Sequence, residues 1–451
     1  MNRRSTRSRR SSSWLLVSSL VASTALPTAA GLTARVTAAE PIAIERGPEL
    51  EGLNLGPAES ESIDDAVARR LARAGSSAVI ELAQEPTNGG EWANEPATQS
   101  TIELTPELVA LRDKLRRVLT MYYPRHQNTR DNNPWEVMHA IIAYGVDTQL
   151  FKGGPGGEKV NAIGWMCYNR PMAGEQMLLV NNGQIEARRG VGVQGHFGQF
   201  LAILAQSRVK PDYPMLVSGK NFTLNDLIEH EKANCFAGEE LTFKLIALMH
   251  YLDSDATWKS RDGQDWSLQR LVAEEIKQPI RGAACGGTHR LMGLSYSVNK
   301  RLQRGKPIVG EFRRAQTFIQ DYHRYTFSLQ NPDGSFSTEW FTRRGNNPDV
   351  DRRLKTSGHI LEWISFSLSP QELADPRMIK AVDYVATILE KNDRHTWEIG
   401  PLGHGLHALS IYHDRMFKDG EGWRPATLVA APQPELPPVL QARRPSGDTT
   451  D

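Results

Sequence analysis

The chain has 451 residues, of which 39% are hydrophobic, and this is enough for one large domain or two small ones. Its formal net charge of +1 hides an asymmetry, because residues 1–39 contain six arginines and no Lys, Asp or Glu. The remaining 47 basic and 52 acidic residues give a net charge of −5, which excludes a general attraction for nucleic acid or anionic membranes.

The first 39 residues have the features of a bacterial export signal. Five arginines precede the apolar stretch Trp14–Leu26, which is too short to remain in a bilayer as a spanning helix. Small residues follow, with Val36-Thr37-Ala38 as a candidate cleavage site. We therefore predict a periplasmic or secreted protein that keeps no stable membrane anchor once the signal is removed.

Two segments of biased composition flank the central part of the chain. Residues 40–103 are rich in Pro, Gly, Glu and Ser, and we expect a mostly irregular linker there. Residues 417–451 contain several prolines and few large apolar residues after Val429, which predicts a disordered tail. The folded domain is expected over residues 104–416.

Six apolar segments in this domain share one register. Each begins with Glu or His and has Ile or Leu five residues later. The six leading residues are Glu136, His196, Glu240, His289, His359 and His404. The segments are apolar on most sides for about three turns, which is typical of buried helices.

One-sided, amphipathic stretches alternate with these buried segments. They are expected over 105–122, 223–234, 267–277, 311–329 and 376–391. Between 177 and 188 the pattern is different, because Asn181-Asn182-Gly183 suits the type I′ turn of a β-hairpin. Buried helices that alternate with one-sided helices require two concentric layers, and the prediction is an all-α (α/α)6 toroid with a β-hairpin insertion at 177–188.

One short motif supports this superfold by resemblance. The segment Leu329-Gln330-Asn331-Pro332-Asp333-Gly334-Ser335-Phe336 resembles the Gln-rich, Asp-Gly-aromatic turn between helix pairs in terpenoid cyclases and protein prenyltransferases. The resemblance implies the helical toroid alone, since the cyclase Asp-x-Asp-Asp motif and the prenyltransferase zinc pattern are both missing. The chain is also similar to bacterial exported proteins labelled "ADP-ribosylation factor-directed GTPase-activating protein". That label implies a four-cysteine zinc finger, which three scattered cysteines cannot build.

In such a toroid the amino-terminal ends of the inner helices meet at one mouth of a central cavity. Six residues are predicted to be catalytic there: His196, Glu240, Cys285, His289, His359 and His404. The positive ends of the helices disfavour a charged imidazole, so these histidines should be neutral and able to act as bases. If the helix begins at Cys285, the positive helix end stabilises the thiolate of this residue. His289 then lies on the same face and can take the proton of the thiol.

Six further residues are predicted to bind substrate, namely Glu136, His139, Arg290, Trp340, Glu362 and His407. Arginine pairs and aromatic residues in the loops suit an acidic sugar chain, because guanidinium binds carboxylate and rings stack on sugars. Ordinary solvated loops explain the same composition.

No metal site is predicted, since the widely spaced cysteines Cys167, Cys235 and Cys285 exclude paired Cys-x-x-Cys modules. Zinc held by Cys285, His359 and His404 is conceivable, although no local spacing demands it. No other cofactor is expected.

Three functions stay open on the sequence alone, and catalysis itself is not established. The first is a polysaccharide lyase or hydrolase, in which His196, His289 or His359 removes a proton. The second is a non-catalytic binding or scaffold toroid. The third is a pocket for an apolar ligand, like that of a terpenoid cyclase. The partner is accordingly a carbohydrate or another small molecule, and no nucleic acid.

Overall fold

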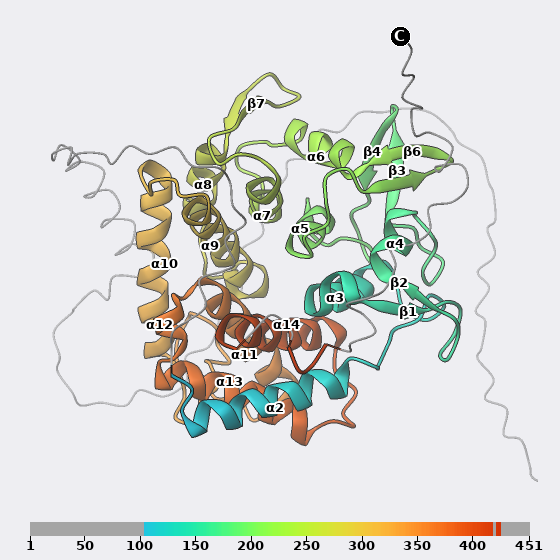
Figure 1. Ribbon diagram of the computed structural model, residues 1–451. Helices are drawn as coiled ribbons and strands as arrows, with labels where there is room; N and C mark the ends of the chain where they lie inside the picture. Colours follow the sequence, from blue (N-terminus) through green and yellow to red (C-terminus); the bar gives the residue numbers. More distant parts are fainter. Residues whose placement is uncertain (1–102, 418–420, 425–451) are drawn as a thin grey trace, which may run out of the picture. The chain divides into compact units, whose positions relative to one another are not determined.

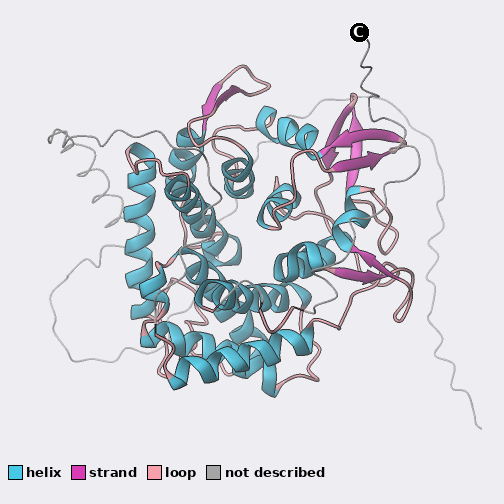
Figure 2. Ribbon diagram, viewed as in Figure 1, coloured by secondary structure: helices cyan, strands magenta, loops and turns pink. Residues whose placement is uncertain are grey.

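The structure of the protein is a computed structural model that describes residues 103–417 and 421–424. The predicted export signal and almost all of the predicted linker and tail lie outside the described residues. The described part is mostly helical, as predicted, with thirteen α-helices and four small two-stranded sheets (Figures 1 and 2). None of these helices has the length and hydrophobicity needed to cross a membrane.

Six helices pack against one another in a closed cycle. They are α3 (Pro134–Tyr144), α5 (Gln199–Gln206), α7 (Thr242–Tyr251), α9 (Thr288–Gln303), α11 (Val350–Ser367) and α14 (Ile399–Met416). Each contacts the next in chain order, and α14 contacts α3, which closes the cycle (Figure 1). Most of their residues are buried, because these helices have neighbours on several sides.

One-sided helices lie on the outside of this cycle. They are α2 (Pro106–Tyr122), α6 (Leu224–Ala233), α8 (Leu268–Ile276), α10 (Gly310–Ser328) and α13 (Pro376–Lys391), with the short α4 (Ala162–Cys167) and α12 (Pro370–Leu373). In α8 the buried residues Leu268, Leu271 and Val272 recur at helical spacing on one side. The contacts of α2 with α13 and α14 join the first and last helices of the described chain.

Each of the four sheets is an antiparallel hairpin. The predicted one pairs β3 (Leu178–Asn181) with β4 (Gln184–Ala187) across Asn182-Gly183, and both turn residues have positive φ as a type I′ turn requires. The sequence analysis missed three others. They pair β1 (Gln149–Phe151) with β2 (Lys159–Asn161), β5 (Pro214–Val217) with β6 (Lys220–Thr223), and β7 (Thr257–Lys259) with β8 (Asp265–Ser267).

These three additional hairpins share a junction that continues directly into a helix. The last residue of the second strand is also the residue before the first turn of α4, α6 or α8. At two junctions its side chain caps that turn, since Asn161 accepts from Gly164 N at 2.9 Å and Ser267 accepts from Arg270 N at 3.1 Å. The hairpin and the helix after it are therefore one repeated unit.

The packed part of the chain extends past the predicted domain boundary at residue 416. Trp423 is buried, and the Arg424 guanidinium forms ion pairs with Asp147 at 2.9 Å and Asp414 at 3.3 Å. These contacts hold residues 421–424 against the turn after α3 and the end of α14. The sequence had predicted a disordered tail for these residues.

Candidate functional site

A tight turn precedes α9 and positions the only half-buried cysteine of the described residues. Cys285 has φ +49°, and the next two residues, Gly286 and Gly287, also have positive φ. A side chain at Gly287 would place its Cβ 2.5 Å from the carbonyl oxygen of Ile280, so only glycine fits there. A cysteine in the left-handed region is strained, and such strain concentrates at functional sites.

Beside this turn, five imidazoles from five different segments meet. We call them the histidine cluster: His139 on α3, His196 just before α5, His289 on α9, His359 on α11 and His404 on α14. The ring centres of His359 and His404 are 3.9 Å apart. His289 lies 5.4 Å from His404, 5.7 Å from His359 and 5.7 Å from His196. His139 joins through His404 at 5.3 Å.

Four of these rings are oriented by an acceptor at Nδ1. In His139 and His359 the acceptor is the carbonyl oxygen one turn earlier, Trp135 O at 2.7 Å and Lys355 O at 2.6 Å. A carbonyl can only accept, so Nδ1 carries the proton and Nε2 has a free lone pair. This is the arrangement that fixes metal-ligating or base histidines.

In the other two rings the acceptor is a carboxylate. His196 Nδ1 lies 2.7 Å from Glu240 Oε2, and His404 Nδ1 lies 2.7 Å from Glu362 Oε2. The second oxygen of Glu362 receives His407 Nδ1 at 2.5 Å. Burial opposes ionisation of Glu362, but these two imidazoles hold its pKa well below the usual range. Both carboxylates are therefore ionised partners of an imidazole.

His289 differs from the other four. Both of its ring nitrogens are buried, and neither has a hydrogen-bond partner among the described residues. Burial, and then the positive potential of His404 and His196, hold its pKa well below the usual value. A neutral imidazole with two unpaired nitrogens at the centre of the cluster is available to bind a ligand.

Three donor atoms at this point could hold a metal ion. Cys285 Sγ and one nitrogen each of His289 and His359 all lie within 4.8 Å of one another. The set contains two of the three residues considered from the sequence, with His289 in the place of His404. Three protein ligands of this type are common at catalytic zinc sites, which keep one position open.

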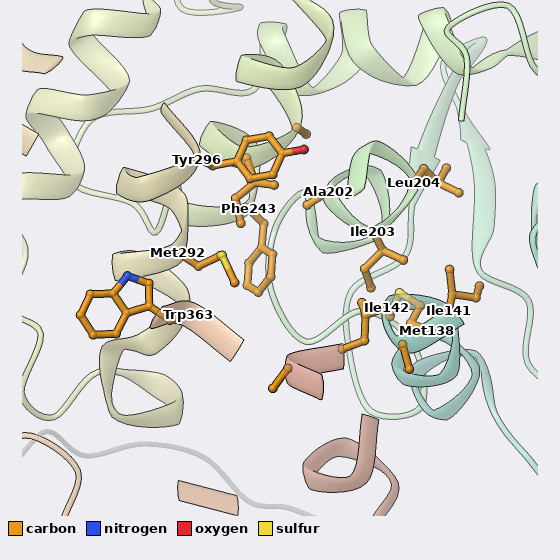
Figure 3. Close-up of a cluster of buried hydrophobic side chains, with 14 of the residues drawn as sticks. Met138, Ile141, Ile142, Ala202, Ile203, Leu204, Phe243, Met292, Tyr296 and Trp363 are labelled. Atoms are coloured by element: carbon orange, nitrogen blue, oxygen red, sulfur yellow. The ribbon is translucent and has the colours of Figure 1, made fainter. Parts of the chain in front are cut away.

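Three residues of the cluster, His139, His289 and His404, line a small central cavity of about 30 Å³, room for about two water molecules. All six helices of the closed cycle contribute to its lining. Below the imidazoles the wall is apolar, and Figure 3 shows Ile142, Ile203, Phe243 and Met292 facing one another from four helices. Water-sized space between a polar and an apolar wall suits a small bound group.

The mouth outside the cluster is partly exposed and carries aromatic and basic groups. His196 and Glu240 keep 20% and 36% of their side-chain surface exposed, so a substrate can reach this pair. Phe197 is 38% exposed beneath the guanidinium of Arg189 at 4.2 Å. Trp340 lies on the other side, 5.7 Å from His359, with Arg352 over its ring at 5.6 Å.

Several predicted site residues have other roles. Glu136 caps α3, because Oε2 accepts from Asn133 N at 2.8 Å, and it does not line the cavity. Arg290 is buried in an ion pair with Glu275 at 3.1 Å. Both were predicted to bind substrate, but their polar atoms serve the helix start and the helix packing.

The condition for the predicted activation of Cys285 is not met, because α9 begins at Thr288 and not at Cys285. The residue precedes α9 in a left-handed turn, and burial raises the pKa of its thiol to about 11, so the helix end does not generate a thiolate. His359 lies in the middle of α11 and His404 in the second turn of α14, and burial instead of a helix end lowers the pKa of His359.

Besides the leading residues His289 and His404, five residues that lie three positions after a leading residue face the cavity. They are His139, Gln199, Phe243, Met292 and Glu362, and all five line the cavity. The sequence analysis named His139 and Glu362 but missed Gln199, Phe243 and Met292. One signal was available, since residues three apart on a buried helix share a face.

The chain was compared with known proteins to test whether this site has a counterpart. No protein-family model matches the chain. No curated protein matches it either.

Proposed function

We propose that the described helices form an (α/α)6 toroid, with the six helices of the closed cycle as its inner layer. The cyclic order of their contacts supports this, as does the alternation of α2, α6, α8, α10 and α13 with them along the chain. Between α3 and α5 two hairpins and the short α4 take the place of an outer helix.

We propose further that the protein is an exported enzyme whose histidine cluster holds zinc or a similar divalent ion. One observation carries this: Cys285, His289 and His359 bring three metal-binding atoms within 4.8 Å of one another. His359 also has the second contact that a metal ligand needs, because its Nδ1–H is fixed by Lys355 O, and His289 has a nitrogen free to bind the ion. A zinc ion in such a site lowers the pKa of a bound water and polarises a substrate oxygen.

The chain's own groups supply the acid and base. The His196–Glu240 pair is the accessible one, and its imidazole is the proposed base because the carboxylate holds Nδ1–H and leaves Nε2 toward the cluster. Buried Glu362 aligns His404 in the same way from the other side. We thus assign proton transfer to the partly exposed His196–Glu240 pair and metal binding to Cys285, His289 and His359.

The proposed substrate is an acidic polysaccharide, cleaved by hydrolysis or elimination. The central cavity admits only water-sized groups, so the sugar would bind at the mouth. Trp340 and Phe197 offer rings for sugar faces, and Arg189, Arg352 and Lys355 offer positive charge for a uronate carboxylate.

Metal analysis of the purified full-length protein tests the ligand set. About one zinc per chain is expected, and cobalt(II) replacement should give the near-ultraviolet absorption of a thiolate–cobalt bond. Cys285→Ser should abolish that band, whereas Cys235→Ser, at a buried cysteine elsewhere, should leave it unchanged. Absence of bound zinc and of the cobalt band would remove the metal from the proposal.

Activity on uronate-containing polysaccharides tests the reaction. Removing the general base, as in His196→Asn, should lower kcat by about 10² to 10⁴. The control is His395→Asn, an exposed histidine paired with Asp351 outside the cluster, which should retain wild-type turnover. A metal-binding protein without turnover on any such polymer would instead support the non-catalytic binding or scaffold function.

A further inference from the structure

A second polar cluster lies at the other ends of three of these helices. Arg208 lies two residues after the end of α5, Lys300 lies in the last turn of α9, and Arg304 follows α9 directly. We call these three residues the basic cluster. Lys300 is eleven residues after His289 on the same helix, which places its backbone about 16 Å from the histidine cluster.

Contacts around the end of α7 draw the basic cluster together. Arg304 Nη2 donates to His250 O at 3.0 Å, and His250 Nδ1 lies 3.1 Å from the Tyr296 hydroxyl. The Lys300 ammonium lies 5.6 Å from the centre of the Tyr296 ring. Burial, followed by the charges of Arg304 and Arg208, lowers the pKa of Lys300 to about 8, so the three cations act on one another.

The neighbouring cations of the same segment are paired, and those of the basic cluster are not. Arg301 binds Asp255 at 2.6 Å, and Lys306 binds Asp253 at 2.6 Å. Among the described residues no carboxylate lies within ion-pair distance of Lys300 or Arg304; Asp253 attracts Arg304 only from farther away. In addition, Arg304 Nη1 is buried without a hydrogen-bond partner.

Helix ends explain part of this arrangement but leave a donor unused. Carbonyl groups at helix carboxyl ends favour nearby cations, and the bond from Arg304 to His250 O satisfies one of them. That bond uses Nη2, whereas Nη1 and the Lys300 ammonium remain without an anionic acceptor. Adjacent guanidinium and ammonium donors of this kind recognise the oxygens of phosphate or carboxylate.

We propose that the basic cluster binds a small oxyanion, through Arg304 and Lys300 with Arg208 at its exposed edge. The site is separate from the histidine cluster and would hold a phosphate or carboxylate group of a ligand. It goes beyond the proposed enzymatic function, because neither the metal nor the His–Glu pairs contribute to it.

Calorimetric titration of the full-length protein with inorganic phosphate and with citrate, near pH 7 and at constant ionic strength, tests the site. Saturable binding of either anion, with a Kd below about 10 mM, is expected. Preference for phosphate or for citrate distinguishes the two kinds of oxyanion. Lys300→Met should weaken the preferred anion at least about tenfold, because it removes one charge-assisted contact.

Two control variants separate this site from other sources of binding. Lys306→Met removes a nearby positive charge that is already paired with Asp253, and it should leave the affinity within about twofold. His359→Gln should also leave it unchanged, since that residue belongs to the other cluster. No saturable binding, an equal loss in the Lys306 variant, or loss in the His359 variant would each overturn the proposal.

Discussion

A buried imidazole lowers the stability of a protein in acid, because burial disfavours its protonated form. His323 allows this effect to be measured away from the histidine cluster. It lies on α10, with Nε2 2.5 Å from the Ser367 hydroxyl and its ring beside Trp363. Burial lowers its pKa to about 4, and the nearby charges of Glu372 and Arg324 have smaller and opposite effects. The folded protein therefore resists protonation at this position.

We predict that His323 contributes a pH-dependent share of the free energy of unfolding. Between about pH 6.5 and pH 4 the unfolded chain binds a proton that the folded chain does not, so stability falls as the pH falls. The loss from this residue between pH 7 and pH 5 is about 2 kcal/mol. Urea unfolding of wild type and His323→Gln at both pH values measures it; equal pH dependence in the two proteins would contradict the assignment.

The positions of individual site residues were only partly predictable from the sequence. The shared register contains four of the five histidines that meet, all but His139, because equivalent positions on packed helices lie at similar depth. It did not identify Gln199, Phe243 and Met292, which face the same cavity one turn later. Nor could spacing indicate that Cys285 takes a left-handed conformation in the turn before α9.

Among secondary-structure elements, the helices followed their local signals more closely than the hairpins did. The expected segment 376–391 coincides with α13, since Asp375 caps it and Pro376 begins it. The strands of the other hairpins have only three or four residues, too few to display a clear alternation. The dipeptides Ser218-Gly219 and Asp262-Gly263 are turn signals between these strands, and the prediction did not use them.

The distance between α14 and α3, the two helices whose contact closes the cycle, depends on Gly403. A Cβ at this position of α14 would lie 2.3 Å from the carbonyl oxygen of His139 on α3. At Gly405, two residues later, a Cβ would meet only side-chain atoms, of Leu354 at 3.0 Å and Leu389 at 3.9 Å. Flexible side chains can rotate away at little cost, whereas a backbone clash is relieved only by shifting one helix against the other, so the two glycines make a matched pair.

We predict that Gly403→Ala destabilises the protein by about 1–3 kcal/mol, because α14 must move away from α3. Gly405→Ala should cost less, or stabilise, since alanine in a helix interior is favoured over glycine by about 0.5–1 kcal/mol. Urea unfolding of the two variants against wild type gives both values. If Gly403→Ala were as stable as Gly405→Ala, the helices would not be held together by this close approach.

At the scale of the whole described domain, the chain is closed by contacts between its first and last helices. The Tyr122 hydroxyl, at the end of α2, donates to Leu389 O on α13 at 3.1 Å and accepts from Trp397 Nε1 at 3.0 Å. These two bonds join segments more than 260 residues apart, and both are buried. A domain closed in this way cannot lose its last helices without exposing the core of its first.

We predict that Tyr122→Phe destabilises the domain by about 1–3 kcal/mol, because it leaves the buried indole N–H and carbonyl without partners. Tyr168→Phe is the control, since the Tyr168 hydroxyl has no hydrogen-bond partner among the described residues, and it should change stability by less than about 0.5 kcal/mol. In urea, the Tyr122 variant should unfold at a lower midpoint but still in one transition. Two separate transitions would mean that the α2–α13 contact joins independently folding halves and does not close a single cooperative unit.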